Sequence, residues 1–102
     1  MKNNGMGTHR TPMRDFVVEV ERPSSAELAD YTRAERYRML RANTEAHRTQ
    51  LEHWLEMQDL GSEVGDMRAG TGFNLIFVEC TPHVAEQLVL APGVIDVLPV
   101  AE

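Results

Sequence analysis

The sequence predicts an α+β fold of the ferredoxin-like, split βαβ type, with the element order β, α, β, β, α, β (βαββαβ). Residues 72–102 have the pattern of a strand, a short helix and a strand with tight connections. An alternating apolar strand precedes them at 15–21, and a long stretch without Gly or Pro lies between the two at 25–58. Together these features predict a four-stranded antiparallel sheet with helices on one face and an extra helical insertion after the first strand.

Composition places the chain among ordinary single-domain globular proteins. It has 102 residues, of which 42% are hydrophobic and 25% charged, and a formal net charge of -6 that disfavours nucleic acid as a partner. The single cysteine excludes an internal disulfide, and no stretch has the pattern of a signal peptide or a membrane span. We therefore expect a cytoplasmic location if the sequence is full-length, and predict none if it was excised from a secreted precursor.

The N-terminal half contains one strand and a helical region. Residues 1–14 are expected to be a flexible tail, and residues 15–102 a single domain whose first strand is Asp15–Glu21. Ser24 and Glu27 have the spacing of a capping box, and residues 24–43 are interpreted as a helical insertion that ends in a break near Asn43 and Thr44. Four arginines in the insertion are interpreted as a solvated helix face rather than a contact for acidic partners: Arg33, Arg36, Arg38 and Arg41.

The C-terminal half contains three strands and a short helix. The strands are predicted at residues 63–67, 73–80 and 94–98. Thr81 is placed to cap the helix with Pro82 in its first position, and Pro92-Gly93 is placed to end it.

Strand alternation then separates a covered sheet face from an open one. The residues expected under the helices are Phe16, Val18, Ile76, Val78, Ile95 and Val97. The open face is expected to show Val17, Leu75, Phe77 and Leu98, with Glu19, Glu21, Glu79 and Asp96 around them. An exposed apolar patch with a rim of carboxylates is typical of a protein-docking surface.

The order of short motifs in the C-terminal half resembles the subtilisin propeptides and the propeptide-like proteinase inhibitors. The matching residues are Phe73, Asn74, Val78, Thr81, Pro82, Ala85, Leu88, Pro92, Gly93, Val94, Val97 and Pro99. The resemblance implies that the open face docks on surface helices of a subtilisin-like serine protease, whose N-termini attract carboxylates. It also implies that a C-terminal tail occupies the substrate cleft, formed by Val97, Leu98, Pro99, Val100, Ala101 and Glu102. This tail is shorter than is typical of that family.

Enzymatic chemistry is not predicted. Cys80 and His83 fall on different elements, and His47 and His53 lack the i,i+4 spacing of a zinc helix. Gly70-Thr71-Gly72 lacks the lysine of a phosphate loop and precedes a strand. The sequence thus predicts a binding protein, with no metal or cofactor, that inhibits a subtilisin-like protease or chaperones its folding. The alternative is a ferredoxin-like interaction domain that forms a homodimer through the open sheet face.

Overall fold

The computed structural model describes residues 12–70 and 73–100 of the chain. The first half consists of strand β1 (Arg14–Val20), helix α1 (Arg33–Met57) and the single-turn 3-10 helix η2 (Gly61–Glu63). The second half consists of β2 (Val64–Ala69), β3 (Leu75–Cys80), α2 (Pro82–Leu88) and β4 (Val94–Pro99). The predicted N-terminal tail lies mostly outside the described residues, and β1 already begins at Arg14.

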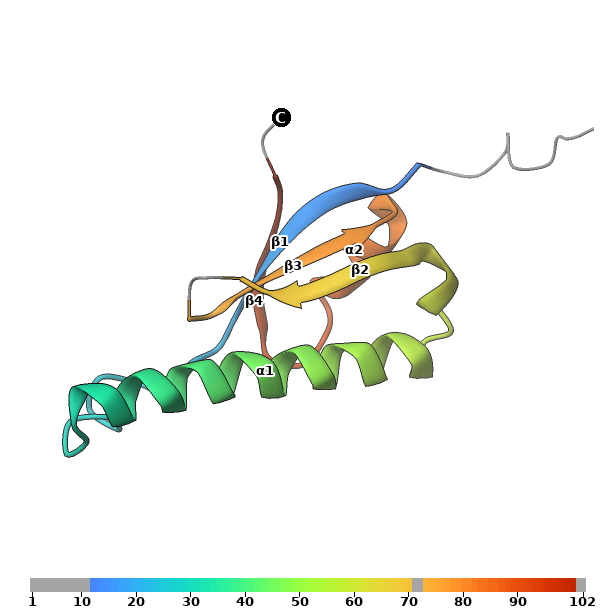
Figure 1. Ribbon diagram of the computed structural model, residues 1–102. Helices are drawn as coiled ribbons and strands as arrows, with labels where there is room; N and C mark the ends of the chain where they lie inside the picture. Colours follow the sequence, from blue (N-terminus) through green and yellow to red (C-terminus); the bar gives the residue numbers. More distant parts are fainter. Residues whose placement is uncertain (1–11, 71–72, 101–102) are drawn as a thin grey trace, which may run out of the picture.

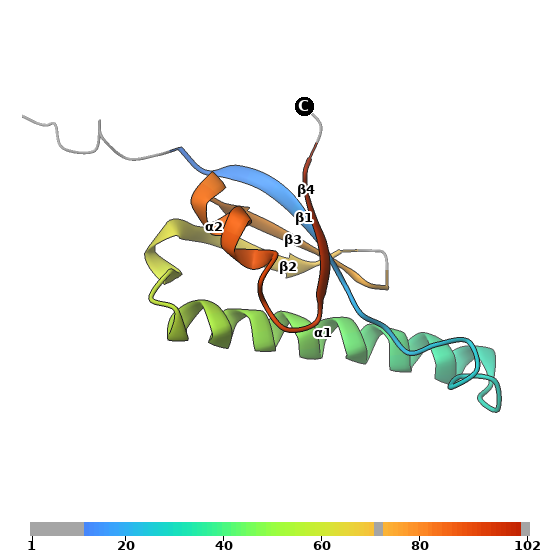
Figure 2. The same cartoon turned by 180° about the vertical axis from the view of Figure 1, so that it is seen from behind.

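The strands form one antiparallel sheet in the order β2-β3-β1-β4, so β1 and β3 are central and β2 and β4 are edges. This is the predicted ferredoxin-like, split βαβ arrangement. Figure 1 shows α1 running below the sheet. Figure 2, the view from behind, shows α2 in front of the sheet. The N-terminal turns of α1 extend beyond the sheet in both views.

A single hydrophobic core lies between the helices and one face of the sheet. Alternate residues of β1 and β3 point into it, among them Val18 and Ile76, which have no exposed surface. The helices contribute Leu51 and Leu55 from α1, and Val84 and Leu88 from α2. Since both helices share this one core, the opposite face of the sheet is left without a covering layer.

The predicted start of α2 is confirmed, whereas its end falls at Leu88, before the predicted Pro92-Gly93. The side chain of Thr81 accepts a hydrogen bond from the N–H of Val84, and Pro82 occupies the first turn, where a missing N–H costs nothing. Gly93 has a φ of 82°, a conformation that favours glycine, and the ring of His47 packs directly against it.

The predicted break in the helical region is wrong, because α1 runs without interruption through Asn43 and Thr44. Both residues use their side chains to bind segments next to the strands. Asn43 Nδ2 donates to the carbonyl of Glu21, just after β1, at 2.8 Å, and the Thr44 hydroxyl donates to the carbonyl of Phe73, just before β3. These tertiary hydrogen bonds compensate for the weak helix propensity of the two residues.

The interpretation of residues 24–43 as a separate helical insertion also needs correction. The Ser24–Glu27 capping box forms, with Ser24 N–H bound to Glu27 Oε1 at 2.7 Å, but it opens only a run of turns over residues 25–30. A second capping box, Thr32 with Glu35, starts α1 at Arg33. The residues from 33 onward therefore belong to the main helix rather than to an insertion.

A bulge in β4 overturns the predicted position of Ile95. The pairing with β1 shifts between Glu19, which lies opposite Asp96, and Val20, which lies opposite Val94. Ile95 is therefore the extra residue and is 56% exposed, while Val94 and Val97 pack against the core.

Candidate protein-docking surface

One row of side chains crosses all four strands on the uncovered face of the sheet. The strand pairings align Arg68 of β2 with Phe77 of β3, Phe77 with Val17 of β1, and Val17 with Leu98 of β4. Val17 and Phe77 are half-buried by their neighbours alone, and Leu98 is 52% exposed. Three adjacent apolar side chains are therefore open to solvent at the centre of the sheet.

Arg68 closes one end of this row. Its guanidinium lies 5.5 Å from the centre of the Phe77 ring, within the range of a cation–π contact, and it pairs with Asp66 at 2.9 Å. A shallow hollow beside this pair is lined by Phe77, Asp15, Glu79 and Val100 among others. The β2 end of the face thus combines an aromatic ring, a cation and several carboxylates.

Carboxylates occupy the rows on either side of the apolar one. Asp15 lies opposite Glu79 in one row, and Glu19 lies opposite Asp96 in the other. Within the described residues none of these four makes an ion pair; Asp96 Oδ1 accepts a hydrogen bond from the Val97 N–H at 2.9 Å, and Glu19 Oε2 accepts one from Asn74 Nδ2 at 3.4 Å. The negative charges are therefore available to a partner that offers N–H groups or cations.

The structure brings most of the predicted docking residues together. Val17, Glu19, Phe77, Glu79 and Asp96 lie on the open face, and Leu75 pairs with Glu19 at its margin. Glu21 lies beyond the end of β1, where its N–H donates to the Gly93 carbonyl at 2.9 Å, so it stands at the periphery.

The predicted cleft tail is mostly strand. Val97, Leu98 and Pro99 are part of β4, and the Val100 N–H donates to the Asp15 carbonyl at 2.9 Å. Val97 packs against the core, so it cannot also enter the cleft of a partner. Ala101 and Glu102 lie outside the described residues. The part of the prediction that assigned Val97 to a free tail is therefore wrong.

Sequence reasoning missed Asp15, Asp66, Arg68 and the exposed Ile95. Asp15 alternates with Phe16 and was detectable as an open-face residue. The position of Arg68 depends on how β2 pairs with β3, where an irregularity falls between Val64 and Met67. No local signal in the sequence reveals such an irregularity, and the same holds for the bulge at Ile95.

The titratable groups away from this surface do not form a reactive centre. Burial raises the pKa of the Cys80 thiol to about 11, which keeps it protonated and unreactive near neutral pH. His83 is exposed on the first turn of α2, and no group of metal-ligating side chains occurs among residues 12–70 and 73–100. In the described chain, α1 and α2 are each too polar or too short to cross a membrane.

Fold and surface together define a ferredoxin-like α+β domain with an uncovered, carboxylate-rimmed sheet face. The profile of the PopD family matches residues 8–96, which is most of the chain, and the chain therefore belongs to the PopD family. Comparison with curated proteins and with solved structures gave no match.

This family assignment corrects the resemblance to the subtilisin propeptides. The motifs behind that resemblance have local roles: Thr81 and Pro82 start α2, and Gly93 supplies the positive φ of the turn before β4. Such residues start a short helix and form a tight turn, which other ferredoxin-like domains with a short second helix also need. The fold explains these residues, and the family match shows that the chain belongs to the PopD family.

Proposed function

We propose that the protein is a binding protein that inhibits a subtilisin-like serine protease, or chaperones its folding, by docking the open face of its sheet. The observation that carries the proposal is the row formed by Phe77, Val17 and Leu98, with carboxylates on both sides that form no ion pair within residues 12–70 and 73–100. A monomeric domain gains nothing from leaving three adjacent large apolar side chains in water, whereas a docked partner would remove them from solvent.

The carboxylates around the apolar row indicate which chemical groups a partner should present. Asp15, Glu79, Glu19 and Asp96 form two carboxylate pairs that flank the apolar row. Carboxylates bind well to the free N–H groups of helix N-termini, so a surface that presents two such termini around an apolar centre is complementary. A protease of the subtilisin class is proposed as a partner that offers two such helix N-termini beside its substrate cleft.

Strand β4 supports the second part of the mechanism. It is an edge strand, and the chain leaves it at Val100 in an extended path paired with Asp15. A partner cleft that lies against this edge would bind the end of β4 by strand addition.

The test is a titration of purified subtilisin-type proteases with the protein, following hydrolysis of a chromogenic peptide. Competitive inhibition is expected, and Phe77→Asp is expected to raise the inhibition constant about 30-fold or more, because it places a charge in the apolar centre. Met57→Asp is a matched control, since Met57 is 70% exposed at the end of α1 and the same charge there leaves the sheet face unchanged. Digestion of the wild-type protein without inhibition, or equal inhibition by Phe77→Asp, would refute the proposal.

A truncation separates the contribution of the tail from that of the sheet face. Removal of Ala101 and Glu102 keeps every pairing of β4 with β1, whereas removal from Pro99 onward would also delete strand residues. Weaker inhibition with unchanged thermal stability is expected for the shorter truncation. Unchanged inhibition would mean that the sheet face acts alone.

The alternative function is an interaction domain that forms a homodimer through the same open face. The same apolar row favours this homodimer. The mass in solution distinguishes the two functions, and a dimer that dissociates in Phe77→Asp would support the homodimer.

A further inference from the structure

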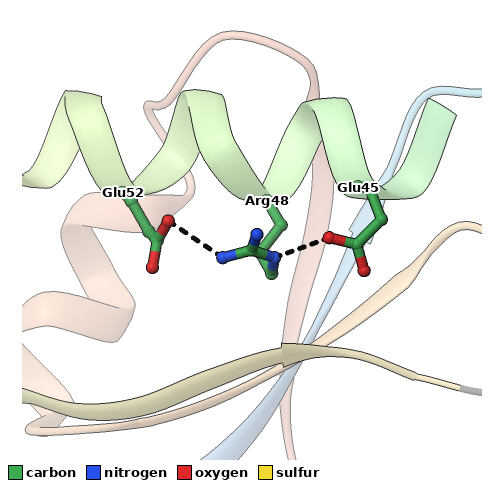
Figure 3. Close-up of polar contacts among 3 residues, drawn as sticks. All are labelled: Glu45, Arg48 and Glu52. Atoms are coloured by element: carbon green, nitrogen blue, oxygen red, sulfur yellow. Dashed lines mark hydrogen bonds and ion pairs between the residues drawn. The ribbon is translucent and has the colours of Figure 1, made fainter. Parts of the chain in front are cut away.

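The exposed surface of the second half of α1 is divided into a charged stripe and an uncharged stripe. Glu45, Arg48, Glu52 and Glu56 follow one another at intervals of three or four residues, so they share one side of the helix. Figure 3 shows Arg48 between Glu45 and Glu52, with a distance of 2.9 Å to each carboxylate. All the charged residues between positions 45 and 56 lie in this stripe.

The other exposed side of the same turns carries no formal charge with histidine neutral. It consists of Gln50, His53, Trp54 and Met57, again at helical spacing. These residues and Pro92, from the turn between α2 and β4, line an open apolar hollow together with Thr49, Leu51 and Gln58. We call this surface the neutral patch.

The neutral patch exposes apolar side chains on a chain of net charge -6. Met57 is 70% exposed, and Trp54 beside it is partly buried. Interface centres are enriched in tryptophan and methionine and depleted of Asp, Glu and Lys, which is the composition found here. The patch lies on the helical side of the core, away from the open sheet face (Figures 1 and 2).

We propose that the neutral patch is the interface through which two copies of this chain associate around a two-fold axis. Near the axis of a two-fold interface each group lies close to its own counterpart, so a charge placed there would face a like charge. Two copies that each carry a net charge of -6 repel one another least where they meet through a region without carboxylates, and the residues that line this patch include none.

The polar residues of the patch are also suited to self-pairing. The side-chain amides of Gln50 and Gln58 each hold a donor and an acceptor, and so does the hydroxyl of Thr49, so each can bond to a copy of itself. Ionised carboxylates only accept hydrogen bonds, so at neutral pH one carboxylate cannot bond to its own copy. The proposal does not depend on the function assigned to the sheet face.

The experiment is sedimentation equilibrium of the full chain over a wide range of concentration. Wild type is expected to approach twice the chain mass of 11.5 kDa, and Met57→Asp to remain at the chain mass. Phe77→Asp is the matched control and is expected to dimerise like wild type, because it changes the opposite face of the sheet. A wild type that stays monomeric, or a dimer lost in Phe77→Asp and kept in Met57→Asp, would overturn the proposal.

Disulfide trapping provides a second measurement that does not depend on weakening the contact. Cys80 is fully buried, so a cysteine introduced on the surface is the one thiol accessible for cross-linking in the described chain. Under mild oxidation Met57→Cys is expected to give a covalent dimer, whereas Glu52→Cys on the charged stripe is expected to stay monomeric. Equal cross-linking of the two variants would indicate random collision and would contradict the assignment of the patch.

Discussion

Replacing Gly93 with alanine tests the contact between α1 and the turn before β4. The φ of Gly93 is 82°, in the left-handed region, where a residue with a Cβ pays about 1–2 kcal/mol. A methyl group built on Gly93 would lie 2.7 Å from Cε1 and 2.9 Å from Nδ1 of the His47 ring. Contacts this short force the ring or the turn to move, and such overpacking costs about 1–3 kcal/mol.

These contributions predict that Gly93→Ala lowers the stability of the fold. Alanine restricts the unfolded chain more than glycine does, which returns about 0.4–1 kcal/mol to the folded state. The free energy of unfolding should therefore fall by about 1–4.5 kcal/mol, measured from urea titrations followed by circular dichroism. For a domain of this size each kcal/mol corresponds to roughly 4–8 °C in Tm, so a thermal melt gives an independent check.

A control and a double mutant make the test specific. Gly61 has open space around the position of a Cβ, so Gly61→Ala should leave the free energy of unfolding nearly unchanged. Adding His47→Ala to Gly93→Ala removes the steric part and leaves the backbone part, so the two substitutions should be coupled by about 1–2 kcal/mol. If Gly93→Ala and Gly61→Ala have the same stability, the assigned turn conformation and the His47 contact are wrong.

Two further predictions concern buried polar groups. Thr44→Val should lower the free energy of unfolding by about 1–3 kcal/mol, because it leaves the Phe73 carbonyl without its donor; an unchanged urea midpoint would contradict this. The raised pKa of Cys80 has a defined sign: its stabilisation is complete below the ordinary pKa of 9.0 and is lost as the pH rises through about 11, because the unfolded thiol releases its proton first. Unfolding titrations between these pH values should show a decline that Cys80→Ala lacks, and a parallel decline in both proteins would exclude Cys80 as its source.

The fold was predictable because most of its elements are encoded locally. The alternation of β1 and β3, the Thr81-Pro82 start of α2 and the Gly93 turn each appear within a few neighbouring residues. The continuity of α1 was not predictable in the same way. Thr44 disfavours a helix by itself, and its compensating hydrogen bond goes to Phe73, which is 29 residues away along the chain.

The centre of the candidate site was likewise predictable, and its margins were not. Strict alternation places Val17 and Phe77 on the open face, and the pairing of the strands confirms that they are neighbours. Arg68 and Ile95 depend on irregular pairing in the two edge strands, and one shifted residue moves a side chain to the other face. Prediction from periodicity therefore succeeds wherever the strands of this sheet pair regularly and fails where an edge strand pairs irregularly.

The distribution of charge suggests that the two exposed apolar surfaces have different partners. A two-fold pairing of open sheet faces would bring Asp15, Glu19, Glu79 and Asp96 close to the same four residues of the second copy, with Arg68 as the cation in the row between them. Like charges in an interface cost several kcal/mol, whereas the neutral patch on α1 carries no such penalty. A partner with helix N-termini or basic side chains has the opposite effect on the sheet face, because there the carboxylates become attractive. Since the two surfaces lie on opposite sides of the core, a dimer formed through α1 would keep both sheet faces available for docking.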